Sequence, residues 1–376
     1  MIYLDNAATS GTKPDTVISA VNKELLQSAN PGRSSHKLAL RASTKIYEVR
    51  ESLSKLFNVN SPESFILTPN ATYALNFAIK GILNSGDHVI ITSMEHNSVL
   101  RPLYSTNHIE ISMIKGNSFG FIDPFKIKEK IKHNTRLIIV NHSSNVNGIV
   151  QDIFKISKIA KSYDIPLLID ASQSAGIIDI DANNFDMIAF PGHKSLYGPQ
   201  GTGGLYLNPH LKLKTLIEGG TGSNSKSFYN PSDSPDRYES GTLNTPGFAG
   251  LREGVEFVLK EGIDNIRNHE HYLLKILLEN LYNMKNITLY SPLNSDLISN
   301  SVAFNINKKD SFETAQILSE NFDICVRAGF HCAYPAHQTL KSDKNGSVRI
   351  SVSYFNTIKE IKETVDAVYK ISNDLI

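Results

Sequence analysis

Two short apolar runs, each followed by a charged side chain, constrain the fold of this chain more than any other feature of its sequence. Leu167–Ile169 leads directly into Asp170, and Met187–Phe190 leads through Pro-Gly-His into Lys194, 24 residues after Asp170. If both runs are neighbouring strands of a parallel sheet, their carboxyl ends meet at one edge, and open α/β sheets bind their ligands at that edge. The sequence therefore predicts an α/β fold that brings Asp170 and Lys194 together.

The apolar pattern extends this prediction over most of the first 250 residues. Helical spacing at residues 36–57 is followed by strand-like runs that alternate with helical segments, which is typical of a buried and mostly parallel sheet. The strand-like runs are Phe65–Leu67, Val89–Thr92, Leu137–Val140, Leu167–Ile169, Met187–Phe190 and Gly204–Leu207, and the clearest helices between them are Ala71–Leu83 and Ile153–Tyr163.

From about Phe248 the pattern changes. A long helical stretch at Leu251–Leu281 precedes three strands and two helices, which predicts a smaller α+β domain. The strands are Val302–Ile306, Ile324–Arg327 and Val348–Val352, and the helices are Phe312–Asn321 and Ile358–Ile371. The segment Gly219–Pro246, rich in Gly, Ser, Asn and Pro, is longer than a plain connector, which favours a functional loop.

Composition excludes several classes of protein. The 376 residues are 40% hydrophobic and 20% charged with a net charge of +1, which is typical of an ordinary enzyme and implies no nucleic acid or other polyanion as a partner. No apolar run approaches the roughly 18 residues of a membrane span, and Met1–Asp5 lacks the parts of a signal peptide. Two cysteines make no disulfide framework, so we expect a cytoplasmic protein with reduced thiols.

An Asp and a Lys at one sheet edge match the needs of one cofactor in particular. Pyridoxal phosphate is bound by a Lys that forms a Schiff base and by an Asp that pairs with the pyridinium nitrogen. Each residue alone has an ordinary alternative, a solvated Lys or an Asp at a helix N-terminus, and only their joint position favours the cofactor. Gln173, three residues after Asp170, either donates to the phenolate oxygen of the ring or is a polar loop residue.

Two further side chains suit such a site. Thr72 stands at the start of a predicted helix, where a hydroxyl and free backbone N–H groups either bind a phosphate or cap the helix. His96 follows the strand Val89–Thr92 and is placed to stack on a flat cofactor or to transfer protons. The glycine-rich run Gly198–Gly204 lacks the Gly-Lys-Ser/Thr ending of a P-loop, and no GxGxxG motif is present, so a nucleotide-binding protein is disfavoured.

The thiol of Cys332, in the run Arg-Ala-Gly-Phe-His-Cys-Ala, is a candidate nucleophile. Its neighbours Arg327 and His331 are cationic side chains that would lower the pKa of this thiol, whereas Cys325 lies in an apolar run and is expected to be inert core. The spacing of Cys and His does not match a zinc site, so no metal is expected. Arg349 interrupts another apolar strand, and a buried Arg binds either a substrate carboxylate or an internal acidic partner.

Taken together, these residues resemble those of the cysteine desulfurases, which belong to the class V aminotransferase group and have fold-type I pyridoxal phosphate architecture. The resemblance covers essentially the whole chain. It implies a large domain of residues 15–250 and a small α+β domain, formed by residues 1–14 and 251–376, that carries the loop with the nucleophilic Cys. The matching motifs are Tyr3–Thr9, Asn30–His36, Glu95-His96, Ser144–Gly148, Asp170–Gln173, Gly192–Lys194, Glu239–Thr242, Arg327–Ala333 and Val348-Arg349.

The resemblance also implies a role for each candidate. Lys194 forms the Schiff base and removes the substrate proton, and Cys332 accepts the sulfur. The implied substrate contacts are Asn145 and Arg349 at the carboxylate, with Ala7 and Arg327 beside them. The implied contacts with the cofactor ring are Asp170 at the pyridine nitrogen, Gln173 at the phenolate oxygen and the catalytic His96 on the ring face. The implied phosphate contacts are Ala71, Thr72 and His193. Thr242 is implied to reach the phosphate of the neighbouring subunit's cofactor, which makes the protein a homodimer.

The implied activity is the conversion of L-cysteine to L-alanine, with the sulfur left as a persulfide on Cys332 and passed to a protein or small-thiol acceptor. The alternatives are selenocysteine lysis, another class V reaction such as transamination or desulfhydration, and a scaffold that keeps the fold without the cofactor. The 17 residues from Cys332 to Arg349 resemble the short loop of SUF-type enzymes rather than the long loop of the ISC type. Asn97, Phe330 and Ala71 depart from the SUF-type pattern, as does the absence of an N-terminal extension.

Overall fold

A seven-stranded sheet forms the centre of the computed structural model, which describes residues 1–27, 29–32 and 34–375. Arg33, part of the Asn30–His36 motif, lies outside the described residues. The strands, in the spatial order β2-β8-β7-β6-β5-β3-β4, are β2 (Phe65–Thr68), β3 (His88–Thr92), β4 (Glu110–Ile114), β5 (Thr135–Asn141), β6 (Leu167–Asp170), β7 (Met187–Pro191) and β8 (Gly203–Leu207). Every neighbouring pair from β4 to β7 is parallel, and β8 is antiparallel to both of its neighbours. The predicted, mostly parallel sheet is therefore confirmed.

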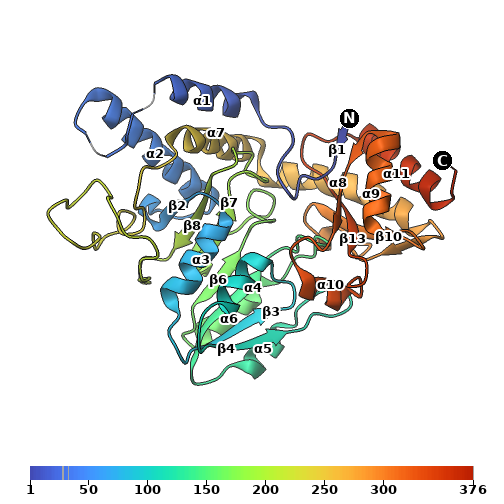
Figure 1. Ribbon diagram of the computed structural model, residues 1–376, viewed down its shortest axis with the longest axis horizontal. Helices are drawn as coiled ribbons and strands as arrows, with labels where there is room; N and C mark the ends of the chain where they lie inside the picture. Colours follow the sequence, from blue (N-terminus) through green and yellow to red (C-terminus); the bar gives the residue numbers. More distant parts are fainter. Residues whose placement is uncertain (28, 33, 376) are drawn as a thin grey trace.

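Helices cover both faces of this sheet (Figure 1). They are α1 (Asp15–Leu26), α2 (Lys37–Leu56), α3 (Ala71–Ile82), α4 (Asn97–Tyr104), α5 (Pro124–Lys130), α6 (Ile153–Ser162) and α7 (Thr245–Glu261). Apolar side chains of α3 and α4 pack with Val89 and Ile91 on one face, and those of α2, α5 and α6 pack in the core of Ile90 on the other. Burial on both faces explains why the strands are continuous apolar runs rather than alternating ones.

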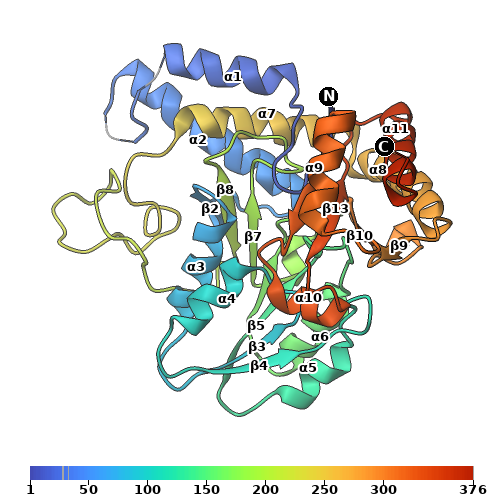
Figure 2. The same cartoon turned by 45° about the vertical axis from the view of Figure 1, so that its right-hand side comes forward.

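The last third of the chain builds a second, antiparallel sheet in the order β12-β13-β10-β9, flanked by helices (Figure 2). Its elements and their neighbours are α8 (Ile263–Tyr282), β9 (Ile287–Leu289), β10 (Ser301–Ile306), α9 (Ser311–Phe322), β11 (Ile324–Cys325), β12 (Arg327–Gly329), α10 (Tyr334–Leu340), β13 (Ser347–Ser351) and α11 (Ile358–Ser372). Short 3₁₀ helices at Pro62–Ser64, Ala182–Asn184 and Ser295–Leu297 complete the described elements.

The N-terminus of the chain lies against this second sheet. β1 (Ile2–Tyr3) pairs in parallel with β11, and Asp5 forms a bridge with Ser351 of β13. These contacts support our proposal that residues 1–14 belong with residues 251–376 in one domain. The boundary expected at residue 250 falls within α7, which packs against α1 and α2.

Two predicted elements are wrong in their extent because the backbone divides them. The expected helix Leu251–Leu281 consists of α7 and α8, separated at Gly262, whose φ of 85° lies in the left-handed region that a helix cannot continue through. The expected strand Ile324–Arg327 is split into β11 and β12, which pair with different partners, β1 and β13. The edge strand β4 escaped prediction because only its last residue, Ile114, is buried.

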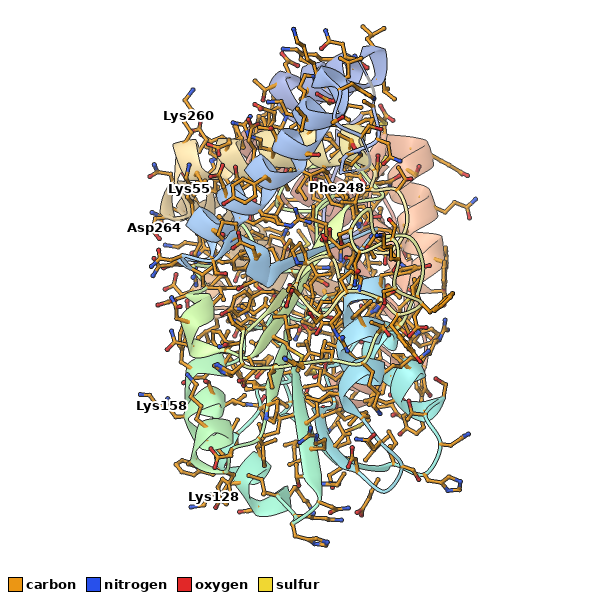
Figure 3. The ribbon with its side chains drawn as sticks, turned by 90° about the vertical axis from the view of Figure 1, so that its left-hand side faces the viewer. Lys55, Lys128, Lys158, Phe248, Lys260 and Asp264 are labelled. Atoms are coloured by element: carbon orange, nitrogen blue, oxygen red, sulfur yellow. The ribbon has the colours of Figure 1, made fainter. Side chains whose placement is uncertain are left out.

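The outward faces of the helices carry charge. Lys55 of α2, Lys128 of α5 and Lys158 of α6 are exposed and point away from the body of the molecule, whereas Phe248 of α7 is buried inside it (Figure 3). Among the described residues, no helix is both long enough and apolar enough to cross a membrane.

A buried ion pair anchors the long segment between β8 and α7, which contains Thr242. The side chains of Glu239 and Arg50 of α2 are only 5% and 8% exposed and are paired with each other. Glu239 Oε1 also accepts a hydrogen bond from the backbone N–H of Leu67 at 2.7 Å, and Arg50 Nε donates to the carbonyl of Phe65 at 3.1 Å. Glu239 therefore ties the segment to both α2 and β2.

We expect Glu239→Ala to lower the free energy of unfolding by about 3 kcal/mol, because it leaves Arg50 as a buried, unpaired charge. Denaturant unfolding at neutral pH measures this difference, with Glu129→Ala, at an exposed position of α5, as the control. Equal stability of the two variants would show that the ion pair is not needed to hold the segment.

Candidate active site

The carboxyl ends of four parallel strands place polar side chains around one cavity of about 100 Å³. Strand pairing sets Asn141 of β5 beside Asp170 of β6, and Asp170 beside Ala189 of β7, so the chain leaving β7 carries Lys194 to the same edge. Eight of the predicted site residues line this cavity, and they are Ala71, Thr72, His96, Asn145, Asp170, Gln173, His193 and Lys194. A larger cavity of about 460 Å³ beside Tyr47 is lined by none of the predicted catalytic, cofactor or substrate residues.

The other predicted residues are Ala7, Arg327, Cys332, Arg349 and Thr242, and they lie outside the wall of this cavity. Two of them contact the wall directly. Gln173 Nε2 donates to the carbonyl of Ala7 at 3.0 Å, and Arg349 Nη1 donates to the carbonyl of Asn145 at 2.8 Å. Thr242 is exposed and lines a separate cavity of about 200 Å³.

Lys194 is half-buried, and its surroundings favour the neutral amine. Burial lowers the pKa of this amine to about 8, with help from the positive charges of Arg349 and Arg327. The carboxyl group of Asp170 opposes this shift. A lysine with a pKa near 8 is largely protonated at neutral pH but loses its proton easily, as an amine nucleophile requires.

Asp170 is buried at the end of β6, with 2% of its surface exposed. Burial raises the pKa of its carboxyl group, while a hydrogen bond from the backbone N–H of Ser172 to Oδ1, at 2.9 Å, and the charge of Lys194 oppose this rise. A buried carboxylate that is only partly compensated gains from a further positive partner, and a protonated ring nitrogen is such a partner.

The two histidines of the cavity are neutral at physiological pH. Burial lowers the pKa of His96 to about 4, assisted by Lys194, and lowers the pKa of His193 to about 4 in the same way. His96 also caps α4, because its Nδ1 accepts the backbone N–H of Ser98 at 3.0 Å. Neutral imidazoles offer a flat ring face and a single N–H donor rather than a charge.

One end of the cavity is the N-terminus of α3. Asn70 caps this helix by accepting the backbone N–H of Tyr73 at 3.0 Å, and Ala71 and Thr72 form its first turn. The hydroxyl groups of Thr72 and Ser98 are 2.8 Å apart. Backbone N–H groups at a helix N-terminus bind anions, so this part of the cavity suits a phosphate. Asn70 rather than Thr72 caps the helix, and the predicted phosphate contact of Thr72 stays a prediction.

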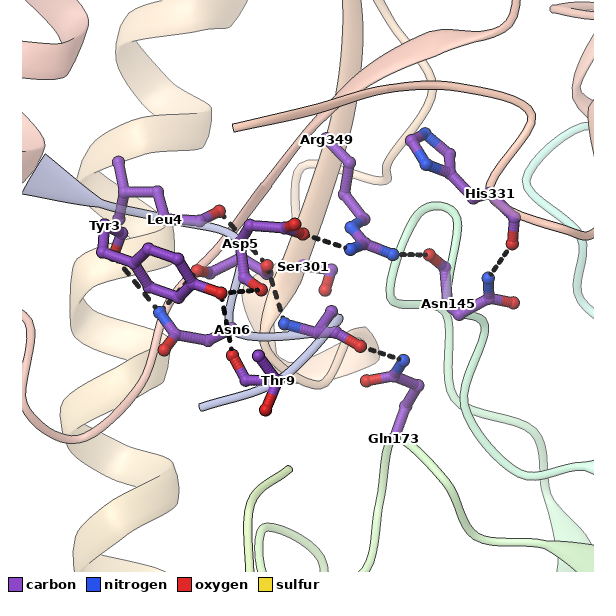
Figure 4. A network of polar contacts seen from close by, with 12 residues as sticks. Tyr3, Leu4, Asp5, Asn6, Thr9, Asn145, Gln173, Ser301, His331 and Arg349 are labelled. Atoms are coloured by element: carbon purple, nitrogen blue, oxygen red, sulfur yellow. Dashed lines mark hydrogen bonds and ion pairs between the residues drawn. The ribbon is translucent and has the colours of Figure 1, made fainter. Parts of the chain in front are cut away.

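Arg349 lies in a network that links the cavity to the N-terminus of the chain (Figure 4). The guanidinium group is 1% exposed, and its Nη2 forms an ion pair with Asp5 at 2.6 Å. Its Nε has no partner among the described residues. The internal acidic partner considered from the sequence is therefore present, and the guanidinium still has an N–H to offer to a ligand.

Cys332 is exposed in the turn between β12 and α10, and its backbone φ is 58°. The preceding His331 is buried and also left-handed, with a φ of 48°. Burial, with smaller effects of Arg349 and His337, lowers the pKa of His331 well below its ordinary value. The expectation that His331 supplies positive charge to the thiol is therefore wrong, because this imidazole is neutral at physiological pH.

Sequence reasoning missed Glu95, whose side chain is completely buried and contacts Asn141, a residue that lines the cavity. Its Oε1 accepts hydrogen bonds from Thr92 Oγ1 at 2.7 Å and from the backbone N–H of Asn141 at 3.0 Å. Burial raises its pKa to about 8, so Glu95 is mostly protonated at neutral pH. Its only signal in the sequence is its place next to His96.

Among the described residues, no group of three or more His, Cys, Asp or Glu side chains is arranged to hold a metal ion.

Comparison with known proteins gives a consistent result. The aminotransferase class-V family model matches residues 2–364 of the chain. A probable cysteine desulfurase of Methanothermobacter thermautotrophicus is 35% identical over 373 residues, which cover 96% of this chain and 92% of that protein. The cysteine desulfurase of Escherichia coli O9:H4 is 30% identical over 388 residues, which cover 99% and 93%.

Solved structures resemble the chain over nearly its whole length. The apo cysteine desulfurase of Thermococcus onnurineus NA1 superposes with a TM-score of 0.92 at 29% identity and covers 99% of this chain and 95% of that one. The cysteine desulfurase CsdA of Escherichia coli superposes with a TM-score of 0.88 at 25% identity, and 100% and 95% are covered.

We predict that Glu95→Gln stabilises the protein more at pH 8 than at pH 5. The unfolded chain loses the Glu95 proton near pH 4.5, whereas the folded protein keeps it until about pH 8. The free energy of unfolding therefore falls across this window, and Gln, which cannot ionise, removes the fall. Unfolding free energies of both proteins at the two pH values test this. The same difference between them at pH 5 and pH 8 would contradict a raised pKa.

Proposed function

Because the chain belongs to the class-V aminotransferase family and is a cysteine desulfurase, we propose that it uses pyridoxal phosphate to release L-alanine from L-cysteine and carries the sulfur as a persulfide on Cys332. The observation that carries this assignment of residues is the pair of Asp170 and Lys194 at one cavity. The carboxyl group is buried there, and the amine has a pKa near 8.

The residues around the cavity fit this cofactor. His193 Nδ1, Asn145 Oδ1 and Gln173 Oε1 are buried and have no hydrogen-bond partner among the described residues. Buried polar atoms without partners are rare and costly in folded proteins, so several in one place indicate a polar ligand. The N-terminus of α3 and the Asp170 carboxyl group both line the cavity, and together they match a molecule with a phosphate and a basic ring nitrogen.

We propose the following division of these contacts. Lys194 would hold the cofactor covalently through Nζ, Asp170 would pair with the ring nitrogen, and Gln173 would donate its second Nε2 hydrogen to the phenolate oxygen. The neutral ring of His96 would lie against the cofactor ring. The proposed phosphate contacts are Ala71, Thr72 and His193.

The reaction then requires that the proton on the substrate α-carbon be removed and that the negative charge left there be stabilised. When bound, the cofactor supplies an electron sink for the charge left on the α-carbon when its proton is removed. Lys194 Nζ would take that proton in its neutral form, which a pKa of about 8 makes accessible near neutral pH. Asn145 and Arg349 hold the substrate carboxylate, with Arg327 and the backbone of Ala7 nearby, and so fix which bond of the substrate faces Lys194.

Cys332 completes the reaction by accepting sulfur. Its Sγ, as the thiolate, attacks the sulfur of the substrate while the carbon–sulfur bond breaks and the electron pair of that bond stays with the carbon fragment. L-cysteine and the enzyme thiol thus become L-alanine and an enzyme persulfide, and no external oxidant or reductant is needed. A protein or small thiol would then take the outer sulfur from Cys332, which is exposed.

Three finer assignments are part of the proposal. The exposed Thr242 would reach the cofactor phosphate of a second copy of the chain in a homodimer, since it lies away from the cavity of its own subunit. The 17-residue span from Cys332 to Arg349, which contains α10, the turn after it and the first three residues of β13, supports the SUF-type branch. The two unpaired cysteines support a cytoplasmic location.

We expect wild-type enzyme, supplied with L-cysteine and a reductant, to release alanine and sulfide in equal amounts, and Cys332→Ala to release neither beyond about 1% of that rate. Cys332→Ala should keep the visible absorption of the bound cofactor, whereas Lys194→Ala should lose both the activity and the covalent attachment. Alanine release by Cys332→Ala at the wild-type rate would contradict persulfide formation on Cys332. If the enzyme shows the visible absorption of the cofactor but makes no alanine from cysteine, its substrate is a different amino acid, and selenocysteine is the next to test.

The pKa of Lys194 makes a second prediction. The rate at which the apoprotein attaches pyridoxal phosphate should rise as the pH is raised through about 8 and level off above it, because only the neutral amine is a nucleophile. Absorbance changes followed after mixing measure this rate. In Asp170→Asn the midpoint should move to lower pH, because the carboxyl group that raises the pKa of Lys194 is gone. A wild-type midpoint near 10.5 would contradict the proposed environment of the amine.

A further inference from the structure

Two hydrogen bonds join the Cys332 loop, defined as residues 330–333, to the segments that follow the parallel strands. The backbone N–H of Asn97 donates to the carbonyl of Cys332 at 2.7 Å. The side-chain Nδ2 of Asn145 donates to the carbonyl of His331 at 2.6 Å (Figure 4). Asn97 follows β3 and Asn145 follows β5, so both donors come from the edge of the sheet that forms the cofactor cavity.

The Cys332 loop needs such anchors because its own geometry is strained and its nucleophile is exposed. His331 and Cys332 are consecutive non-glycine residues with positive φ, and each left-handed residue costs about 1 kcal/mol. Such a backbone persists only when the surroundings hold it. Since the side chain of Cys332 is exposed, its packing does not supply the restraint.

Both anchors adjoin groups of the proposed active site. His96, which precedes Asn97, lines the cavity, and so does Asn145 itself. The backbone carbonyl of Asn145 also accepts from Arg349 Nη1 at 2.8 Å. The Nδ2 amide group carries two hydrogens, so it can donate one to His331 and one to a substrate carboxylate at the same time.

We propose that the backbone N–H of Asn97 and the side-chain amide of Asn145 are positioning groups that dock the Cys332 loop on the cofactor cavity and set the place from which the thiol meets the substrate sulfur. This inference rests on the proposed function and deepens it. Asn145 acts on both the loop and the substrate carboxylate, whereas Asn97 acts on the loop alone. The two residues therefore separate loop docking from substrate binding.

Asn97→Pro removes the first anchor with little change elsewhere. Asn97 is the first residue of α4, where proline is well tolerated because that N–H has no partner within the helix. The preceding His96 has φ −76° and ψ 157°, which is the extended conformation that a residue before proline prefers. Asn97→Ala is the matched control, because it changes the side chain and keeps the N–H.

In the holoenzyme we expect Asn97→Pro to lower kcat for alanine release by about 10- to 100-fold while KM for L-cysteine changes by less than about threefold, because only the nucleophile is misplaced. Asn97→Ala should match the wild type. Asn145→Ala should both lower kcat and raise KM. Retention of the visible cofactor absorption in each variant shows that the cavity itself is intact.

A second readout does not depend on the activity. The rate at which iodoacetamide alkylates Cys332, measured by peptide mapping with Cys325 as the internal reference, should rise by at least about threefold in Asn97→Pro and in Asn145→Ala, because an undocked loop moves more freely. Wild-type kcat and wild-type alkylation in Asn97→Pro would overturn the proposal. If the wild type releases no alanine, the proposed function fails, and alkylation alone decides whether the two groups dock the loop. If Asn97→Pro does not fold, Asn145→Ala decides by the same alkylation rate.

Discussion

The buried guanidinium group of Arg349 joins three parts of the fold that are far apart in the sequence. It lies on β13, pairs with Asp5 of the N-terminal segment at 2.6 Å, and donates to the carbonyl of Asn145 after β5 at 2.8 Å. A charge that is 1% exposed requires such partners, because an unpaired buried charge costs several kcal/mol. The same N-terminal segment contacts Gln173 through the carbonyl of Ala7, so the antiparallel sheet, the N-terminus and the cofactor cavity are fixed relative to one another.

This arrangement also determines the pKa values of the basic side chains that line the cavity. Burial is the largest influence on its basic groups, and the cationic side chains act in the same direction, so the pKa of Lys194 falls to about 8 and that of His96 to about 4. Its histidines are neutral, and the positive charge comes from Lys194 in its wall and from Arg349 and Arg327 outside it. Such a cavity attracts a carboxylate or a phosphate. Asp170 lines the same cavity, and we propose that its carboxyl group is the acidic partner of a cofactor ring.

The sequence predicted the residues whose positions follow from strand order, and it missed those whose state depends on tertiary contacts. Asp170 and Lys194 line one cavity because parallel strands bring their carboxyl ends to one edge of the sheet. The apolar runs in the sequence are enough to predict this arrangement. Glu95 looks like an ordinary charged residue in the sequence, and only its contacts with Thr92 and Asn141 reveal a buried acid. The partner of Arg349 was left open for the same reason, since Asp5 lies more than three hundred residues away.

The same distinction applies to the nucleophile. The sequence predicts the thiol of Cys332 as the nucleophile and a charged His331 beside it, but burial removes the charge of His331. After the Cys332 loop, α10 occupies Tyr334–Leu340 and β13 begins at Ser347, so the chain has little free length with which to swing the thiol between the cavity and a distant partner. We therefore infer that the position of Cys332 depends on how the two parts of the fold are held together, through Arg349 and the donors to the loop. If Cys332 carries the sulfur, as we propose, the acceptor approaches the thiol at this exposed position.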